Sequence, residues 1–223
     1  MSGFAIAVDG PASSGKGTVA RLVAGELGFI YVDTGAMYRA TALMAERRGI
    51  ALDDGPSLAS MIEGLAFRLT FEDGRFSIAV DGEDLSSAIR SEGVGRRASR
   101  VAVQPMVRSA LLDTQRAMAR REGVVMDGRD IGTVVLPNAE LKVFLDASVD
   151  VRARRRHMEL VARGEEASFS TVRDELVARD AQDRGRATAP LLQAEDAVYM
   201  DTTDLTPEGA RDTIVRLARR RLA

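Results

Sequence analysis

The 223-residue chain contains no cysteine, which excludes disulfide bonds, thiol catalysis and zinc sites built on thiolates. No apolar run approaches the length of a membrane span, and Asp9 interrupts the first run too early for a signal peptide. The formal net charge is only -2, so the basic excess typical of proteins that bind nucleic-acid polymers or membrane surfaces is missing. We therefore expect a cytoplasmic protein that has neither a nucleic-acid polymer nor a membrane as its partner.

The composition is otherwise that of an ordinary globular protein. Hydrophobic residues make up 45% of the chain, enough for a proper core, and charged residues make up 29%. This length suits one domain with insertions better than two independent domains. We predict a single domain over residues 1–223, and nothing in its surface pattern indicates more than a monomer.

A glycine-rich segment follows the first apolar run and has the spacing G-x-x-x-x-G-K of a phosphate-binding loop. Its glycines let successive N–H groups point inward, and the helix that follows adds its positive N-terminal end. The alternative is a tight strand-to-helix turn with a surface lysine, but the strand context, spacing and residue types agree on the loop. The residues predicted to bind ATP are Gly10, Pro11, Ala12, Ser13, Ser14, Gly15, Lys16, Gly17 and Thr18.

Two details of this loop point toward a small kinase. Lys16 and Lys142 are the only lysines among 31 basic residues, so lysine occurs where a slim ammonium must fit a phosphate cradle. The position after Lys16 holds Gly17, and the hydroxyl that usually binds Mg²⁺ there comes one place later, at Thr18. The ending Lys-Gly-Thr resembles that of small nucleoside monophosphate kinases.

Five short apolar runs have the character of buried parallel strands, and an aspartate follows each of them directly. Amphipathic helical patterns lie between them, for example at residues 16–27 and 36–48, and a last helix is predicted at residues 207–221. Strand ends with polar groups line the edge of an open sheet at which ligands bind. We predict a doubly wound α/β fold whose five parallel strands lie at residues 4–8, 29–32, 124–126, 141–145 and 198–200.

Two stretches depart from this alternation of strands and helices. Residues 66–80 alternate apolar and polar side chains around Asp73-Gly74, and Asp81-Gly82 follows, which predicts a small antiparallel sheet. It lies in a predicted insertion over residues 39–103. Residues 152–169 begin with an arginine run that predicts a helix, and Ser170 is the predicted cap of the next one. A solvated helix face would explain that run. Its place after a core strand instead favours an arginine-rich lid that covers bound phosphates.

Charged residues on a predicted inward-facing stripe suggest a second phosphorylated ligand. At helical spacing Val172 and Leu176 share one face with Arg179, Asp183 and Arg186. An internal salt-bridge cluster would account for these charges, but arginines also follow the second and third predicted strands. Guanidinium groups grip phosphate oxygens bidentately, so an acceptor phosphate facing the loop is the second explanation.

Together these segments resemble the bacterial cytidylate kinases. The resemblance rests on residues 10–18, 33–39, 98–108, 127–130 and 179–191, and it includes the small antiparallel sheet. It implies that Arg39, Arg129 and Arg186 hold the acceptor phosphate, and that Arg179 and Asp183 hold the ribose. Cytosine would be read by Ser99, Arg108 and Asp130. Tyr38 would pack near the nucleotide, and Thr34 supplies a hydroxyl where the family often has serine.

The expected reaction is transfer of the terminal phosphoryl group of ATP to CMP or dCMP. Lys16, Arg129 and the lid arginines Arg155 and Arg156 would supply positive charge to the migrating group. The sequence shows no metal cage, so Mg²⁺ is expected to arrive with ATP, and His157 is expected at the surface. A kinase for UMP, AMP or shikimate is an alternative, as is a nucleotide-dependent switch or binding module, although the guanine-reading sequence Asn-Lys-x-Asp does not occur.

Overall fold

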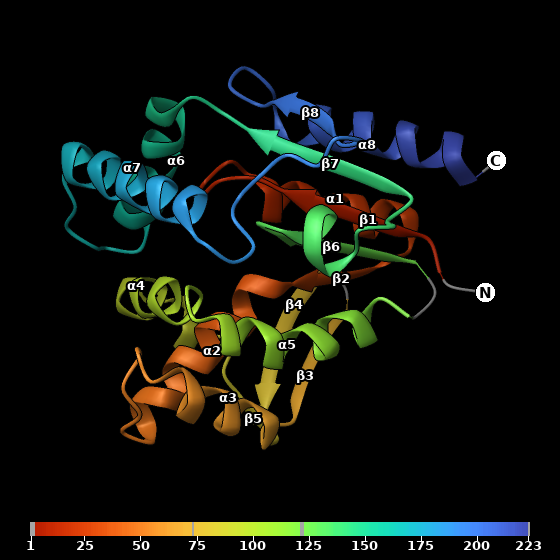
Figure 1. Ribbon diagram of the computed structural model, residues 1–223. Coiled ribbons are helices and arrows are strands. Elements are labelled where there is room, and N and C mark those ends of the chain that lie inside the picture. Colours follow the sequence, from red (N-terminus) through yellow and green to blue (C-terminus); the bar gives the residue numbers. More distant parts are fainter. Residues whose placement is uncertain (1–2, 73, 121–122, 223) are drawn as a thin grey trace.

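Five apolar segments form one parallel sheet in the computed structural model, which describes residues 3–72, 74–120 and 123–222. The strand order is β2-β6-β1-β7-β8 (Figure 1). Each strand lies within two residues of its predicted position and includes the aspartate expected after its apolar run, which confirms the five-stranded parallel sheet. The bounds are β1 Ala5–Asp9, β2 Ile30–Asp33, β6 Val124–Gly128, β7 Leu141–Asp146 and β8 Val198–Asp201.

Helices cover both faces of this sheet, as a doubly wound fold requires. On one face Ile6 and Val8 pack under α1 (Lys16–Leu27) and α8 (Pro207–Leu222). On the other face Ala5 and Ala7 join a cluster with a π-helical turn at Ile131–Val135. Successive residues of β1 thus alternate between two cores. Within the described part of the chain, no helix has the length and apolarity to cross a membrane.

The predicted antiparallel sheet is present and consists of β3 (Phe67–Glu72), β4 (Arg75–Val80) and β5 (Glu83–Asp84). Phe67 pairs with Val80 at one end of the β3–β4 ladder, and Glu72 pairs with Arg75 at the other. Of the first predicted turn, Asp73 lies outside the described residues. At the second turn Asp81 and Gly82 both have positive φ, 52° and 86°, as a tight hairpin turn requires.

Around this small sheet lie α2 (Thr34–Arg47), α3 (Gly55–Glu63), α4 (Glu92–Val101) and α5 (Pro105–Met118). Their shared core contains Met37, Leu58 and Ile78 together with Val107 and Leu111 of α5. Side chains cap three of the helices at their N-termini: Asp33, Asp54 and Ser91. The packing of the predicted insertion therefore continues past residue 103 into α5.

The segment predicted to be a lid, residues 152–169, contains most of α6 (Val149–Ala162) and the loop that leads to α7 (Phe169–Gly185). Helix α6 begins at Val149, capped by Ser148, and not at Arg152. The prediction that Ser170 caps the next helix is wrong. Ser168 has the extended backbone of a capping residue and its hydroxyl accepts a hydrogen bond from the N–H of Thr171, which places Ser170 inside the first turn.

Arg152 joins this helix pair to the phosphate-binding loop. Its side chain is 2% exposed and donates to the carbonyl oxygens of Ala147 and Ala12, at 2.9 and 3.1 Å. It also pairs with the buried carboxylate of Asp180 on α7, at 2.6 Å. A buried ion pair of this kind is costly to break because the remaining charge stays desolvated.

We expect Arg152→Met to lower the free energy of unfolding by about 3 kcal/mol, because it leaves Asp180 buried without its partner. Urea unfolding measures the change. Arg173→Met is the matched control, since Arg173 pairs with Asp150 on the same two helices at an exposed position, and it should change stability little. Equal effects of the two substitutions would contradict the role of Arg152.

Candidate functional site

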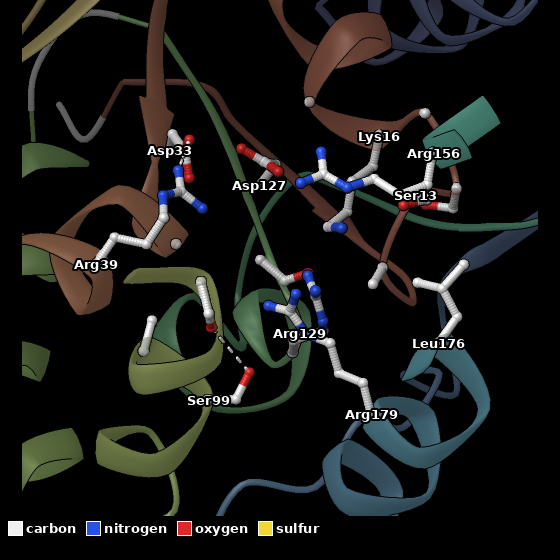
Figure 2. A pocket seen from close by; sticks show the side chains of 18 of the residues that line it. Ser13, Lys16, Asp33, Arg39, Ser99, Asp127, Arg129, Arg156, Leu176 and Arg179 are labelled. Atoms are coloured by element: carbon white, nitrogen blue, oxygen red, sulfur yellow. Dashed lines mark hydrogen bonds and ion pairs between the residues drawn. The ribbon is translucent and has the colours of Figure 1, made fainter. Parts of the chain in front are cut away.

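A cleft of about 1090 Å³ lies at the carboxyl edge of the parallel sheet. It is bounded by the phosphate-binding loop, the start of α2, helix α4, the end of β6 and the pair α6–α7. Every residue proposed from sequence lines this cleft except Gly10 and Pro11 at the beginning of the loop. Figure 2 shows side chains from these separate segments directed toward the same space.

The loop has the backbone of an anion-binding turn. Gly10, Ser13 and Gly15 have φ values of 154°, 60° and 86°, in the region that favours glycine. A Cβ on Gly10 would lie 2.0 Å from the carbonyl oxygen of Leu145, so no side chain fits there. Helix α1 starts at Lys16 without a side-chain cap, which leaves its first N–H groups for a ligand.

Lys16 lies inside this loop and is 7% exposed. Its Nζ donates to the carbonyl oxygen of Pro11 at 3.0 Å. Burial, reinforced by the nearby Arg129 guanidinium, lowers the pKa of Lys16 to about 7, while Asp127 opposes the shift. The site thus lacks enough negative charge to stabilise the ammonium form of Lys16, and a bound anion would supply that charge.

Opposite the loop, Asp183 on α7 lies among several arginines. It accepts from Arg129 Nε at 2.8 Å and lies 3.8 Å from Arg186 Nη1. Burial alone would raise the pKa of Asp183, but Arg129, Arg186 and Arg179 together hold it below its usual range. Burial and the charge of Arg129 lower the pKa of Arg179 to about 10. The single carboxylate of Asp183 therefore partly balances the charge of several guanidinium groups.

Two of these arginines have buried nitrogen atoms without partners. Arg186 Nε and Nη2 and Arg179 Nε make no hydrogen bond to the described residues. Arg186 is the C-cap residue just beyond α7 and still points into the cleft, as the predicted stripe requires. Unsatisfied buried guanidinium donors next to excess positive charge are complementary to a phosphate group.

A second pair, Arg108 and Asp130, lies deeper in the cleft. Arg108 Nη2 donates to Asp130 Oδ2, both residues are at most 7% exposed, and the guanidinium lies 5.3 Å above the ring centre of Tyr38. Arg108 Nη1 also donates to the carbonyl oxygen of Ala102 at 3.1 Å. The pair offers a carboxylate acceptor and a guanidinium donor side by side, above an aromatic ring.

Asp9, at the end of β1, fixes the backbone that carries Asp130. Its two carboxylate oxygens accept from the N–H groups of Ile131 and Gly132, at 2.8 and 2.7 Å. Burial raises the pKa of Asp9 to about 7, although these two hydrogen bonds oppose the shift. The sequence identified Asp9 only as a strand-end carboxylate, and its partners could not be found from spacing.

The remaining proposed acceptor residues form hydrogen bonds or ion pairs within the protein itself. Arg39 pairs with Asp33 at 2.7 Å, and the hydroxyl of Thr34 donates to the carbonyl oxygen of Asp127 at 2.8 Å. Ser99 donates to the carbonyl oxygen of Gly95 at 3.3 Å. These side chains face the cleft, and a ligand would compete with or extend the bonds they already make.

The two proposed lid arginines are placed differently. Arg155 lies against the loop, donating to the carbonyl oxygens of Ser14 at 3.4 Å and Thr202 at 2.6 Å. Arg156 pairs with Glu159 and with Glu92 at the start of α4, so it spans the cleft. His157 lies outside the cleft lining, and its Nε2 is 3.0 Å from the carbonyl oxygen of Ala167.

Asp127 and Tyr31 line the cleft and were given no role by the sequence. The Tyr31 hydroxyl donates to Asp127 Oδ1 at 2.7 Å, and burial, with the charge of Asp33, raises the pKa of Asp127 to about 6. Asp127 could have been found as a buried strand-end carboxylate beside the loop, whereas Tyr31 gave no signal beyond a strand residue. In the described part of the chain no three His, Cys, Asp or Glu side chains group as metal ligands.

A phosphate-binding loop faced by a buried excess of arginine defines a P-loop protein that brings two phosphorylated ligands together. The family model described as cytidylate kinase matches residues 6–220. A cytidylate kinase of Exiguobacterium sp. (strain AT1b) is 51% identical over 95% of this chain and 95% of its own length. A cytidylate kinase of Geobacter sp. (strain M21) is 47% identical over 100% of this chain and 95% of its own length. The chain belongs to the cytidylate kinase family.

One solved structure supports the fold independently of sequence. An uncharacterized protein from Eubacterium ventriosum superimposes with a TM-score of 0.52, covering 97% of this chain and 98% of that one. The two sequences are 12% identical. This likeness concerns the α/β architecture alone.

Binding of metal-free ATP at pH 8.5 should be accompanied by proton uptake. The free protein holds the pKa of Lys16 at about 7, so its amine is mostly neutral at that pH, and the bound triphosphate restores the ammonium. Calorimetric titration in two buffers of different ionisation enthalpy measures the protons taken up. Lys16→Met should abolish the uptake, and equal heats in both buffers for the unsubstituted protein would refute the low pKa.

Proposed function

We propose that the protein transfers the terminal phosphoryl group of ATP to CMP or dCMP, giving ADP and CDP or dCDP. The observation that carries this proposal is the pairing of two anion-binding features across one cleft. The loop before α1 provides one, and the arginines gathered around Asp183 provide the other. The membership of the cytidylate kinase family supports the same reaction.

ATP would bind along the loop from Gly10 to Thr18. Ser14 Oγ is buried and has no hydrogen-bond partner among the described residues, as expected of a group that contacts phosphate. Lys16 would contact the outer phosphates. Arg155 already lies against the Ser14 carbonyl oxygen, next to the phosphate path.

CMP would lie across the opposite half of the cleft. Its phosphate would be held by Arg39, Arg129 and Arg186, and its ribose by Arg179 and Asp183. Cytosine has an amino donor beside acceptors, so Asp130 would accept from the amino group while Arg108 and Ser99 donate. The ring of Tyr38 lies beneath Arg108 and would close the base site from one side.

Mg²⁺ would enter with ATP and be held by phosphate oxygens, water, Thr18 and Asp127. The structure fits this ion, because Asp127 Oδ2 lies 3.7 Å from the point at which a Cβ on Gly17 would sit, beside the loop. Carboxylate oxygen combined with substrate phosphate is the ligand set that Mg²⁺ prefers. When bound, the ion would neutralise charge on the outer phosphates.

Catalysis would depend on alignment and on positive charge, since the acceptor phosphate is already ionised near neutral pH. Lys16 is buried, and the half-buried Arg129 lies close enough to lower the pKa of Lys16. Arg155 and Arg156 would complete this charge, and Arg156 would have to exchange Glu92 for phosphate. A monomer that acts in the cytoplasm suffices for this mechanism.

An acceptor panel with ATP and Mg²⁺ tests the reaction. We expect CMP and dCMP to be phosphorylated with the highest kcat/KM among nucleoside monophosphates, because uracil would present a carbonyl to Asp130. Efficient phosphorylation of UMP or AMP, at least equal to that of CMP, would refute the base assignment. Tight ATP binding without turnover of any acceptor would favour the binding module instead.

Arg108→Met should reduce the preference for CMP over UMP at least tenfold, because the base loses a buried charged donor and Asp130 loses its partner. The ratio of kcat/KM values for the two acceptors measures this preference. Arg211→Met, at an exposed pair on α8, is the matched control and should leave the ratio unchanged. An unchanged ratio in Arg108→Met would rule out a base-reading role.

A further inference from the structure

We propose that Tyr31 is a positioning residue for the ATP–Mg²⁺ half of the site, acting through Asp127 and in place of a hydroxyl at position 17. This inference rests on the proposed function. Tyr31 is 3% exposed, and its hydroxyl donates to Asp127 Oδ1 at 2.7 Å, a bond between buried groups on neighbouring strands. Asp127 in turn faces the cleft beside Lys16 (Figure 2).

The strand register explains how this bond forms. Tyr31 of β2 pairs with Val125 of β6, and Asp127 lies two residues further along β6, on the same face. The long tyrosine side chain spans this diagonal under α1, where it packs with Val19 and Ala20. A shorter residue on this register would not reach the carboxylate.

The small antiparallel sheet holds the ring of Tyr31 from the other side. The rings of Phe71 and Phe76 meet it edge-on, with centroids 5.6 and 5.5 Å away and interplanar angles of 68° and 74°. Edge-to-face packing of this kind fixes ring orientation. The phenol oxygen is therefore held in one place by residues far from the loop in sequence.

The same oxygen occupies the space next to Gly17. A Cβ on Gly17 would lie 3.4 Å from the Tyr31 hydroxyl and 3.7 Å from Asp127 Oδ2. A serine Cβ there would be in van der Waals contact with the Tyr31 hydroxyl, so a serine hydroxyl would compete with it for the space beside Asp127. In the common form of the loop the residue after the lysine supplies a hydroxyl to the metal. Here that residue is a glycine, and the Tyr31 hydroxyl and Asp127 lie beside it.

This arrangement gives Tyr31 a defined task. With Oδ1 engaged by the phenol, the carboxylate of Asp127 is oriented so that Oδ2 is next to the loop. A carboxylate that binds a metal or its water ligands needs such a hydrogen-bonded partner to fix its orientation. Loss of the hydroxyl would leave Asp127 present but free to rotate.

Tyr31→Phe removes the hydroxyl and keeps the ring against Phe71 and Phe76. We expect kcat to fall about tenfold, the size of one hydrogen bond to a charged group, with the KM for CMP unchanged. The Mg²⁺ concentration for half-maximal rate should rise by a similar factor. Tyr199→Phe is the matched control, because Tyr199 is 53% exposed on β8, and its kinetics and Mg²⁺ response should equal those of the unsubstituted protein.

A binding measurement separates positioning from stability and needs no acceptor. The thermal midpoint is compared for the free protein, with ATP alone, and with ATP and Mg²⁺. Tyr31→Phe should keep the increase due to ATP alone and lose most of the further increase due to Mg²⁺. A lower midpoint of the free protein with the Mg²⁺ increment intact would mean that Tyr31 is structural only, and would overturn the proposal.

The space beside Gly17 supplies a reciprocal test. Gly17→Ser alone should reduce kcat, because the added side chain crowds the Tyr31 hydroxyl. Combined with Tyr31→Phe, which vacates that space, the same substitution should recover part of the lost kcat and of the Mg²⁺ increment. Additive losses in the double variant would overturn the proposal. If the unsubstituted protein phosphorylates no CMP, the proposed function fails, and the Mg²⁺ increments still decide the role of Tyr31.

Discussion

The ion pair between Arg129 and Asp183 joins the end of β6 to α7, and the other charges of the cleft are arranged around it. Arg186 lies near the same carboxylate, and Arg179 lies close enough to lower the pKa of Asp183. The charge of Arg129 in turn lowers the pKa of Lys16 in the loop. In this cluster the cations outnumber the carboxylates, so the ion pairs with Asp183 offset only part of the repulsion between the arginines. Without bound anions the site therefore keeps an excess of positive charge, and this excess is the basis of its affinity for anions.

The architecture could be predicted because its signals are local. Each core strand is a short apolar run ending in aspartate, and the loop carries its own spacing, so neither depends on distant residues. The inward stripe on α7 was also predictable from helical periodicity: Asp183 is buried, and Arg179 and Arg186 line the cleft. The assignment of individual ligand contacts stays a prediction.

Features that depend on tertiary partners escaped prediction. Arg152 was predicted only as the start of the arginine run of a lid, but it is buried because Asp180 and two carbonyl oxygens accept hydrogen bonds from it. Ser170 and Ser168 are equally suitable caps by residue type, and only the backbone decides between them. Tyr31 carries no motif, since its significance comes from strand register and from aromatic residues some 40 positions away.

Asp9 belongs to the strand that leads into the phosphate-binding loop, and its carboxylate grips the turn that follows Arg129 and Asp130. The phosphate-binding loop and the turn that follows Asp130 are thus held rigidly to the same edge of the sheet. The hydrogen bonds of Asp9 that join these two segments do not involve α4 or α6. The sheet therefore sets the distance between the two segments that would face the donor and the acceptor phosphate, before either substrate binds.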